Sequence, residues 1–391
     1  MGNNVVAFPG SGRGNARGVV PSRLRDARLA GRLNQSELAE AIGISRQAIS
    51  AFEQGEKSPE PETLSRIAST LNQSVAFFAT EDREVFGESS TRFFRKFGPD
   101  TKRRNLMCDV FGKWFVQTTR YFFDFVNFPQ VALPSAASPT LATGRYSDEE
   151  IETAAELCRI EWGLGTGPLS NVVGLLESKG VAVCRYEFAE EQIEAFSFWN
   201  GPRPFIFLSS DKNSAARARF DAAHELGHLI LHRWIGSEEI EDPKVLKEIE
   251  REANRFAGAF LLPRRSFPNE VYTTRLDAFV TLKRRWKVAI QAMVYRCKDL
   301  AIFDEDQITN LYKQISYRKW RTKEPLDDEL PLEQPKLLTR AADLVVKSGK
   351  KMADQIVAEI QISADFLAAI CGVSGQFFDA LKPVEFTPSL K

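Results

Sequence analysis

The chain has 391 residues, of which 43% are hydrophobic and 27% charged, and its 52 basic residues balance 52 acidic residues. This composition is ordinary for a globular protein, and the length favours two or three domains. A net charge of zero gives no overall field for nucleic acid, so any DNA binding must depend on local patches. No apolar run approaches the ~20 residues that cross a bilayer, and the five scattered cysteines indicate reduced thiols, so we expect a cytoplasmic protein without a membrane partner.

Elements read along the chain predict a mainly α-helical protein with one small β-sheet, an α+β fold. Residues 1–20 are rich in Gly, Asn and Arg and are expected to form a disordered tail. We expect an all-α helix-turn-helix domain over 21–82 and an aromatic-rich helical connector with a linker over 83–145. A domain built around the sheet is expected over 146–321, and a helical C-terminal region over 322–391.

Residues 33–55 have the pattern of a helix-turn-helix. Apolar residues line one short helix, Gly43 permits the turn, and Ser45 can cap the second helix. The outward side chains of the second helix suit base edges and phosphates, and Gln35 at the start of the first helix suits the DNA backbone. A helical hairpin that contacts another protein is the alternative. The residues expected to contact a double-stranded DNA operator are Gln35, Ser45, Arg46, Gln47 and Ser50.

Two basic clusters lie beside this motif. One runs along the first helix of the domain. The other is interleaved with phenylalanines, and it is either a solvated surface or a contact for phosphate or single-stranded nucleic acid. The aromatic helix expected over 105–128 is typical of a packing surface or of a homodimer interface, and 129–144 is expected to be a linker. The clusters are Arg23, Arg25, Arg28 and Arg32, and Arg92, Arg95, Lys96, Lys102, Arg103 and Arg104 among Phe93, Phe94 and Phe97.

The sheet is predicted from three runs rich in β-branched and aromatic residues, at 181–188, 193–199 and 203–209, with a turn at Asn200-Gly201. Capped helices are expected before it, to about residue 162 and over 168–179. Helical patterns follow at 276–286, 288–300 and 307–320. The charged segment 322–335 is expected to be a second linker before the C-terminal helices.

The most informative motif is His224-Glu225-Leu226-Gly227-His228, directly after the sheet. Residues i and i+4 of a helix lie only ~40° apart around its axis, so both imidazoles can reach one metal ion. Glu225 then lies beside the fourth ligand, a water, where it can act as a general base. All three histidines of the chain fall within nine residues of an apolar helix, where buried imidazoles need partners. The motif predicts a zinc site for peptide-bond hydrolysis.

A third protein ligand is expected on the helix that covers residues 248–263. Its apolar stripe places Glu250 nearer the buried face than Glu252, and Asn254 one turn later can orient a ligand. Glu250 is therefore the preferred ligand and Glu252 the alternative. His232 competes with both, but it lies on the same helix as the other two histidines, and three ligands in a row cannot surround a tetrahedral ion.

These segments resemble a known family. Residues 217–232, followed by Glu250-Arg-Glu-Ala-Asn-Arg-Phe-Ala and Leu261-Leu-Pro, are similar to the ImmA/IrrE family of bacterial zinc metallopeptidases. The resemblance spans roughly 150–300. It implies His224, His228 and Glu250 as zinc ligands, Glu225 as the base, and a helix-turn-helix repressor as the protein substrate. Residues 33–55, with Glu53, Gly55 and the Pro59-Glu-Pro sequence, are similar to the XRE-type (Cro/C1) DNA-binding domain.

The sequence therefore favours a DNA-binding regulator joined to a zinc endopeptidase, which cleaves a repressor in a stress, mobile-element or phage-related response. In similar zinc peptidases an extended substrate adds to an edge strand, for which 195–198 and 205–208 are the candidates. The alternative is a transcription factor that uses the zinc domain as a sensor or scaffold, with latent catalysis. An intact Glu225 argues against that alternative, because a structural site has no use for it.

Overall fold

The computed structural model describes residues 18–81, 93–94, 101–139, 144–188, 195–210, 214–236 and 239–378. Most of the expected disordered tail, and Arg92, Arg95 and Lys96 of the second basic cluster, lie outside these residues. The chain divides into two compact units: unit 1 holds 1–84, 103–112 and 361–363, and unit 2 holds 85–102, 113–360 and 364–391. Helices predominate and one small sheet lies in unit 2, so the fold is α+β, as the sequence predicts.

The described residues 18–81 of unit 1 form five short helices with strong local signals. They are α1 (Pro21–Ala30), α2 (Gln35–Ile42), α3 (Arg46–Gln54), α4 (Pro61–Thr70) and α5 (Val75–Ala79). Asn34 and Glu37 form a capping box at the start of α2, and Gly43 ends it with a φ of 70°. The Ser45 hydroxyl accepts from Ala48 N–H and caps α3, which confirms the cap expected from the sequence.

The sheet of unit 2 has the strand order β1-β3-β4-β2, with β1 (Phe93–Phe94), β2 (Ala182–Tyr186), β3 (Ala195–Asn200) and β4 (Arg203–Ser209). Strands β3 and β4 form an antiparallel hairpin, and β2 runs parallel to β4. Strand β1 adds antiparallel to β3, where it pairs Phe93 with Ser197 and Phe94 with Phe196. The turn at Gly201 has a φ of 57°, a conformation that glycine adopts without strain.

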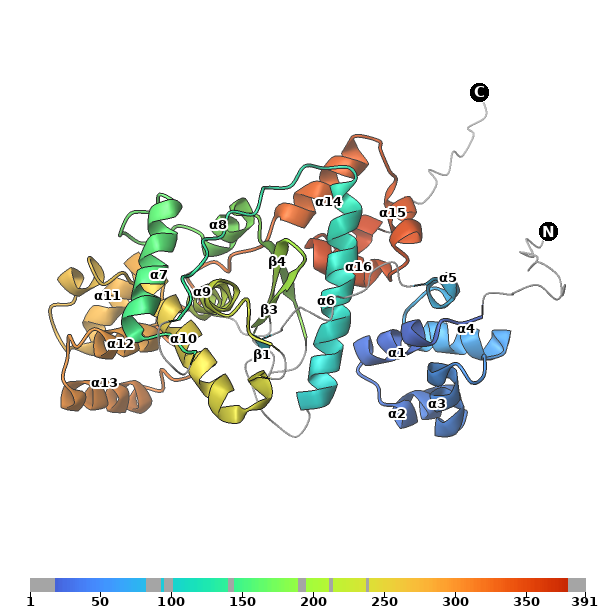
Figure 1. Ribbon diagram of the computed structural model, residues 1–391, viewed down its shortest axis with the longest axis horizontal. Helices are drawn as coiled ribbons and strands as arrows, with labels where there is room; N and C mark the ends of the chain where they lie inside the picture. Colours follow the sequence, from blue (N-terminus) through green and yellow to red (C-terminus); the bar gives the residue numbers. More distant parts are fainter. Residues whose placement is uncertain are drawn as a thin grey trace, which may run out of the picture. The chain divides into compact units, whose positions relative to one another are not determined.

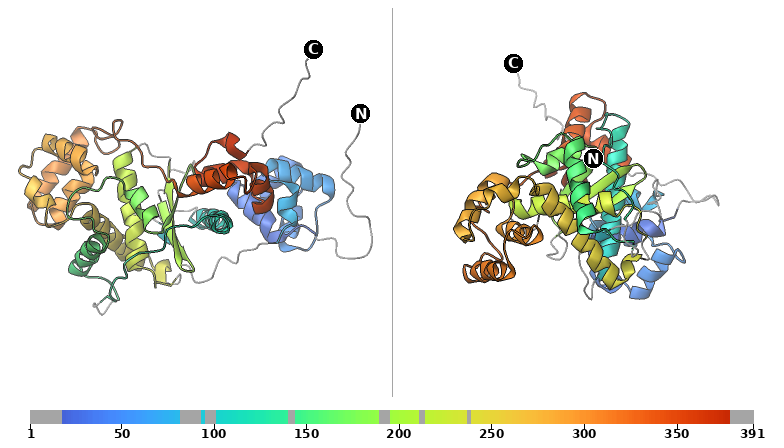
Figure 2. Two further views of the ribbon diagram at one scale, coloured as in Figure 1. Left: turned by 90° about the horizontal axis from the view of Figure 1, so that it is seen from above. Right: turned by 60° about the vertical axis from the view of Figure 1, so that its left-hand side comes forward.

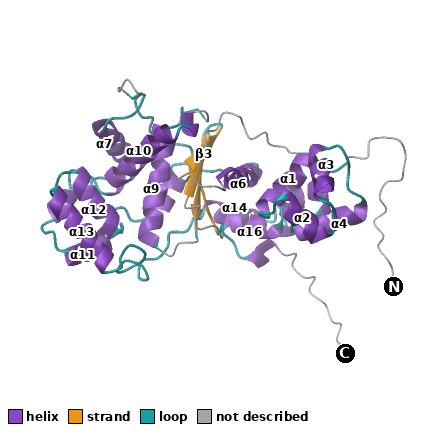
Figure 3. Ribbon diagram, turned by 90° about the horizontal axis from the view of Figure 1, so that it is seen from below, coloured by secondary structure: helices purple, strands orange, loops and turns teal. Residues whose placement is uncertain are grey.

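The two faces of this sheet are covered by different helices of unit 2. Helix α9 (Ala215–Leu231) packs on one face against β3 and β4. The other face carries aromatic rings, and Phe115 of α6 (Thr101–Phe123) contacts Phe205 and Phe207 of β4 edge to face. Figures 2 and 3 show α9 and the last part of α6 on opposite sides of the strands. Because successive side chains of a strand point to opposite faces of the sheet, the aromatic rings lie on the face that α9 does not cover.

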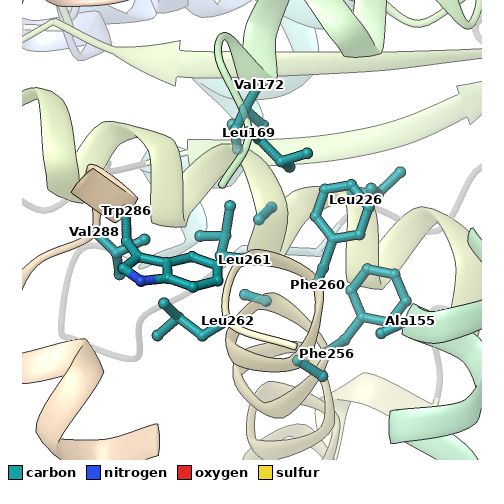
Figure 4. Packing of buried hydrophobic residues seen from close by; sticks show 14 of the residues in the cluster. Ala155, Leu169, Val172, Leu226, Phe256, Phe260, Leu261, Leu262, Trp286 and Val288 are labelled. Atoms are coloured by element: carbon teal, nitrogen blue, oxygen red, sulfur yellow. The ribbon is translucent and has the colours of Figure 1, made fainter. Parts of the chain in front are cut away.

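Helix α10 (Pro243–Leu261) is the second helix of the core and packs against both α9 and α7 (Asp148–Glu161) (Figure 1). Its apolar side chains repeat at helical spacing and form one cluster with those of its neighbours. Figure 4 shows Phe256 and Phe260 of α10 beside Leu226 of α9 and Ala155 of α7. This shared core holds α9 and α10 in a fixed relation, which positions the polar residues described below.

The remaining helices of unit 2 extend this core. They are α8 (Val172–Ser178), α11 (Leu276–Trp286), α12 (Ile290–Asp299), α13 (Glu305–Tyr317), α14 (Leu337–Lys347), α15 (Ala353–Ile360) and α16 (Ala364–Cys371), with short 3-10 turns at Glu239–Glu241, Phe267–Glu270 and Gly375–Phe378. All five cysteines are buried thiols, as the sequence indicates. Among the helices described, none has the length and apolarity to cross a membrane.

Segment 322–335, expected to be a linker, is instead packed into unit 2. Lys283 of α11 is buried between Glu324 and Asp327, at 2.8 and 2.7 Å. Glu333 is ion-paired with the buried Arg219 of α9 and accepts two backbone N–H groups at the start of α8. The charge and proline content of this segment suggested that it is exposed to solvent. Its carboxylates instead neutralise buried cations, and such partners cannot be recognised from composition.

Candidate functional site

Helix α9 carries the first two residues of a candidate metal centre. His224 and His228 lie one turn apart on its buried face, and their Nε2 atoms are 3.0 Å apart. The helix begins at Ser214, whose hydroxyl caps it and is itself held by Asp327. Its neighbours on both sides of the motif are apolar and buried, so the helix presents two imidazoles inside the core rather than in water.

Glu250 of α10 supplies a third group at the same point. Its Oε2 lies 3.4 Å from His224 Nε2, and its Oε1 lies 3.3 Å from His228 Nε2. One ligand atom from each of the three residues falls within 4.8 Å of the others. Burial opposes ionisation of Glu250, but the two histidines outweigh it and hold the pKa of this carboxyl well below its usual range.

The donor set fits a divalent cation. His224 Nδ1 lies 3.0 Å from Asn254 Oδ1, which can only accept, so the proton is on Nδ1 and the Nε2 lone pair faces His228 and Glu250. Lone pairs and a carboxylate that converge in a buried place repel one another unless a cation lies between them. Two imidazoles and one carboxylate that leave a position open are the usual ligands of a catalytic zinc ion.

Glu252 is placed differently from what the apolar stripe suggested. We expected Glu250 to be nearer the buried face, but Glu252 is 0% exposed and the side chain of Glu250 is 17% exposed. Even so, Glu252 lies outside the group that could hold a metal. Its Oε2 is 2.8 Å from His232 Nε2 and its Oε1 accepts Tyr146 N–H at 3.0 Å. Burial raises the pKa of Glu252 and lowers that of His232.

Gly227, inside the motif, permits the close approach of α10. A Cβ atom at this position would lie 3.2 Å from atoms of Phe256 and 3.3 Å from Ala253 Cα. Since Ala253 Cα is backbone of α10, a side chain here would push away the helix that carries Glu250. This role of Gly227 was not predicted, although a glycine inside a strongly helical pattern is a signal for close packing.

Glu225 is buried on α9 next to His224, and its backbone carbonyl is 3.4 Å from the Ser197 hydroxyl of β3. Trp199, also on β3, donates its Nε1–H to the carbonyl of Leu229 at 3.2 Å. These two side chains tie β3 to α9 along the length of the motif. Strand β3 is therefore held against the helix that carries the motif.

In the described part of the sheet, neither of the two strands proposed for substrate addition is an edge strand. Strand β4 pairs with β3 on one side and with β2 on the other, so 205–208 is a central strand and the expectation that it forms an edge is wrong. On β3, the outer edge is paired with β1 at Phe196 and Ser197. A substrate strand at that place would compete with β1 for the same backbone groups.

A cleft of about 670 Å³ opens beside Glu250 and Asn254. We call it the Glu250 cleft. It lies between α10 and α12 and is continuous with the metal-binding group through Glu250 itself. Its lining combines apolar and aromatic surface with charged groups at the rim, and includes Phe220, Ala292, Tyr295, Asp299 and Tyr312.

In unit 1, the residues expected to contact DNA lie at the start of α2 and on α3. Arg46 and Gln47 are exposed in the first turn of α3, Ser50 is half-buried, and Ser45 is the exposed cap of the same helix. Gln35 differs, because its amide Nε2 donates to Glu53 at 2.9 Å. Exposed polar groups at the start of a helix suit phosphates and base edges.

The first basic cluster is only partly a surface feature. Arg23 is buried and stacks on the ring of Phe77, with its guanidinium carbon 4.8 Å from the ring centre. Arg28 is buried in a bidentate pair with Glu53 at 2.6 and 2.9 Å. The expectation that all four arginines form one basic patch along the first helix is therefore wrong, because two of them hold α1 inside unit 1.

Fold and site together define a chain in which a helix-turn-helix accompanies a metallopeptidase-like domain with a candidate His/Glu metal site. Residues 176–298 match the model of the Peptidase_M78 family, described as the IrrE N-terminal-like domain. Residues 24–78 match a helix-turn-helix family model. The chain is also 32% identical over 78 residues to the cryptic phage CTXphi transcriptional repressor RstR of Vibrio cholerae. That match covers 20% of this chain and 64% of the repressor, less than two thirds of its length.

Proposed function

We propose that the chain is a DNA-binding transcriptional regulator with zinc-dependent endopeptidase activity, acting in the cytoplasm on a repressor or another regulatory protein. The observation that carries the proposal is the convergence of His224, His228 and Glu250 at one buried point, with Glu225 next to His224. The match to the IrrE N-terminal-like domain covers all four residues and supports the same conclusion.

In this proposal His224, His228 and Glu250 hold Zn²⁺. A bound zinc ion supplies Lewis acidity, which polarises a scissile carbonyl and lowers the pKa of water to about 7. Glu225 accepts a proton from the attacking water and delivers it to the leaving amine. Asn254 keeps the ring of His224 oriented through its Nδ1–H, so that its Nε2 stays directed at the site.

The Glu250 cleft favours a polypeptide as substrate. It is large enough for several side chains, and its aromatic and apolar lining can bury them next to Glu250, one of the proposed zinc ligands. A flexible segment of another protein fits this requirement, because an extended chain can place its scissile bond at Glu225 while neighbouring residues occupy the cleft.

The regulatory part of the proposal rests on unit 1. In this proposal Arg46, Gln47 and Ser50 on α3 contact base edges, and Ser45 and Gln35 contact the DNA backbone. The similar phage protein is a transcriptional repressor by name. We propose that the chain binds a double-stranded operator through this helix, as a homodimer when the operator is palindromic.

The peptidase is tested by co-expressing the chain with helix-turn-helix repressors encoded beside its gene and following each repressor by immunoblot. The expected result is cleavage of one repressor, its loss when purified components are treated with a chelator, and its return when Zn²⁺ is added. Absence of cleavage for every such partner, with zinc bound at one ion per chain, would contradict the endopeptidase activity.

A further inference from the structure

A buried series of hydrogen-bonding groups leads away from the metal-binding group. His228 Nδ1 lies 3.0 Å from His232 Nδ1, and His232 Nε2 lies 2.8 Å from Glu252 Oε2. Glu252 Oε1 accepts from Tyr146 N–H, just before α7. Both His232 and Glu252 are 0% exposed, so bulk water does not replace these partners.

The donors and acceptors of this series restrict where its protons lie. With both imidazoles neutral, two arrangements satisfy every contact. In the first, Glu252 is a carboxylate, His232 donates from Nε2 to it, and His232 Nδ1 accepts the Nδ1–H of His228. In the second, Glu252 is protonated and donates to His232, so His232 donates from Nδ1 and the proton of His228 is on Nε2.

Only the first arrangement leaves a lone pair on His228 Nε2. In the second, the Nε2–H of His228 points into the space shared with His224 Nε2, 3.0 Å away, and Glu250 Oε1, 3.3 Å away, and occupies the direction a metal needs. We propose that His232 and Glu252 are positioning residues that hold His228 in its metal-binding tautomer. This inference rests on the proposed zinc site and deepens it.

Different hydrogen-bond partners therefore orient the two histidine ligands. Asn254 on α10 accepts directly from His224, whereas His228 reaches a carboxylate through a second imidazole. Tyr146 N–H fixes one oxygen of Glu252, which leaves the other to face His232. In metal sites the loss of such an outer partner typically lowers metal affinity about 10- to 100-fold, and we expect this range here.

Glu252→Gln is the most informative substitution, because glutamine has the shape of glutamate but carries a hydrogen-bond donor in place of one carboxylate oxygen. The Gln carbonyl must accept from Tyr146 N–H, so its NH₂ group faces His232 Nε2 and requires an acceptor there. His232 then carries its proton on Nδ1, and His228 carries its own on Nε2. Zn²⁺ affinity, measured by competition with a chromophoric chelator, should fall about 10- to 100-fold. Glu161→Gln, at an exposed position on α7, is the control and should leave the affinity unchanged.

A pair of His232 variants separates positioning from packing. An asparagine places its Oδ1 close to where His232 has Nδ1, so His232→Asn keeps an acceptor for His228, whereas His232→Phe keeps the ring and removes both polar atoms. We expect His232→Asn to bind Zn²⁺ within a few-fold of wild type and His232→Phe to lose about 10- to 100-fold. Equal losses in both variants would assign His232 a packing role only.

The tautomer itself is read by ¹⁵N NMR of histidine-labelled wild-type protein, so the inference does not depend on any variant folding. The expected result is a proton on His228 Nδ1 in the zinc-loaded protein and in the zinc-free protein alike. A proton on Nε2 in the zinc-free protein, or wild-type Zn²⁺ affinity in Glu252→Gln, would overturn the inference. Failure of wild-type protein to bind Zn²⁺ at all would instead overturn the proposed function, which keeps the two failures distinct.

Discussion

The close packing of α9 on α10 can be tested at Gly227. In Gly227→Ala, the new methyl group would lie 3.2 Å from the Phe256 side chain and 3.3 Å from Ala253 Cα. Overpacking of this kind costs about 1–3 kcal/mol, and alanine recovers up to about 1 kcal/mol of helix propensity. With the full recovery we expect a net loss of about 0–2 kcal/mol in the free energy of unfolding, because a backbone atom cannot move away as a flexible side chain would.

Gly258→Ala is the matched control on α10. Its Cβ would meet nothing closer than Arg296 Cδ at 3.6 Å, an ordinary contact, so the variant should be about 0.5–1 kcal/mol more stable than wild type. Urea unfolding of zinc-free protein, followed by tryptophan fluorescence, measures both, and all six tryptophans belong to unit 2. A Gly227→Ala protein as stable as Gly258→Ala would refute the packing argument.

Three further predictions concern the ligand set, the DNA surface and the buried ion pairs. Glu250→Gln should weaken Zn²⁺ retention about 10-fold or more, because a charged ligand is lost. Dialysis followed by metal analysis measures the retention, and full retention would show that Glu250 is not a metal ligand. Arg46→Ala and Gln47→Ala should each cost ~1–3 kcal/mol of binding at a specific operator, with Gln35→Ala acting less selectively. Unchanged affinity in the double variant would make α3 a protein-contact surface. Lys283→Met should cost about 3–5 kcal/mol in urea unfolding, because it leaves Glu324 and Asp327 buried without their cation. Burial opposes ionisation of Asp327, but Lys283 and its other hydrogen bonds hold its pKa below the usual value, so its contribution is present at neutral pH and is lost as the pH falls below about 4. A pH profile of stability that is the same with and without Lys283 would contradict this.

Local patterns predicted the elements that surround the site. The caps at Ser45 and Ser147 and the turn at Gly201 are determined by neighbouring residues, so they could be predicted from the sequence alone. The i, i+4 spacing of His224 and His228 likewise places their rings side by side on an α-helix, independently of the tertiary fold.

Features that depend on tertiary contacts were harder to predict. The apolar stripe of α10 predicts that Glu250 is more deeply buried than Glu252. Burial on α10 depends on α7 as well as on α9, however, and the backbone N–H of Tyr146, just before α7, donates to Glu252. Arg23 and Arg28 look like surface cations because their sequence does not reveal Phe77 and Glu53 as partners. The order of the strands, which makes β4 central, also follows from a crossover and not from any local signal.

The most direct test of the central claim uses Glu225→Gln, since Glu225 is the one residue of the motif proposed to move a proton and not to hold the metal. Purified Glu225→Gln should keep one zinc ion per chain, its fold and its operator affinity, while cleavage of the repressor falls by ~10²- to 10⁴-fold. In cells under inducing stress, a reporter for the controlled promoter should then stay silent and the repressor should remain intact. Induction equal to wild type, with the repressor uncut in both strains, would contradict the peptidase account and favour a metal-dependent sensor.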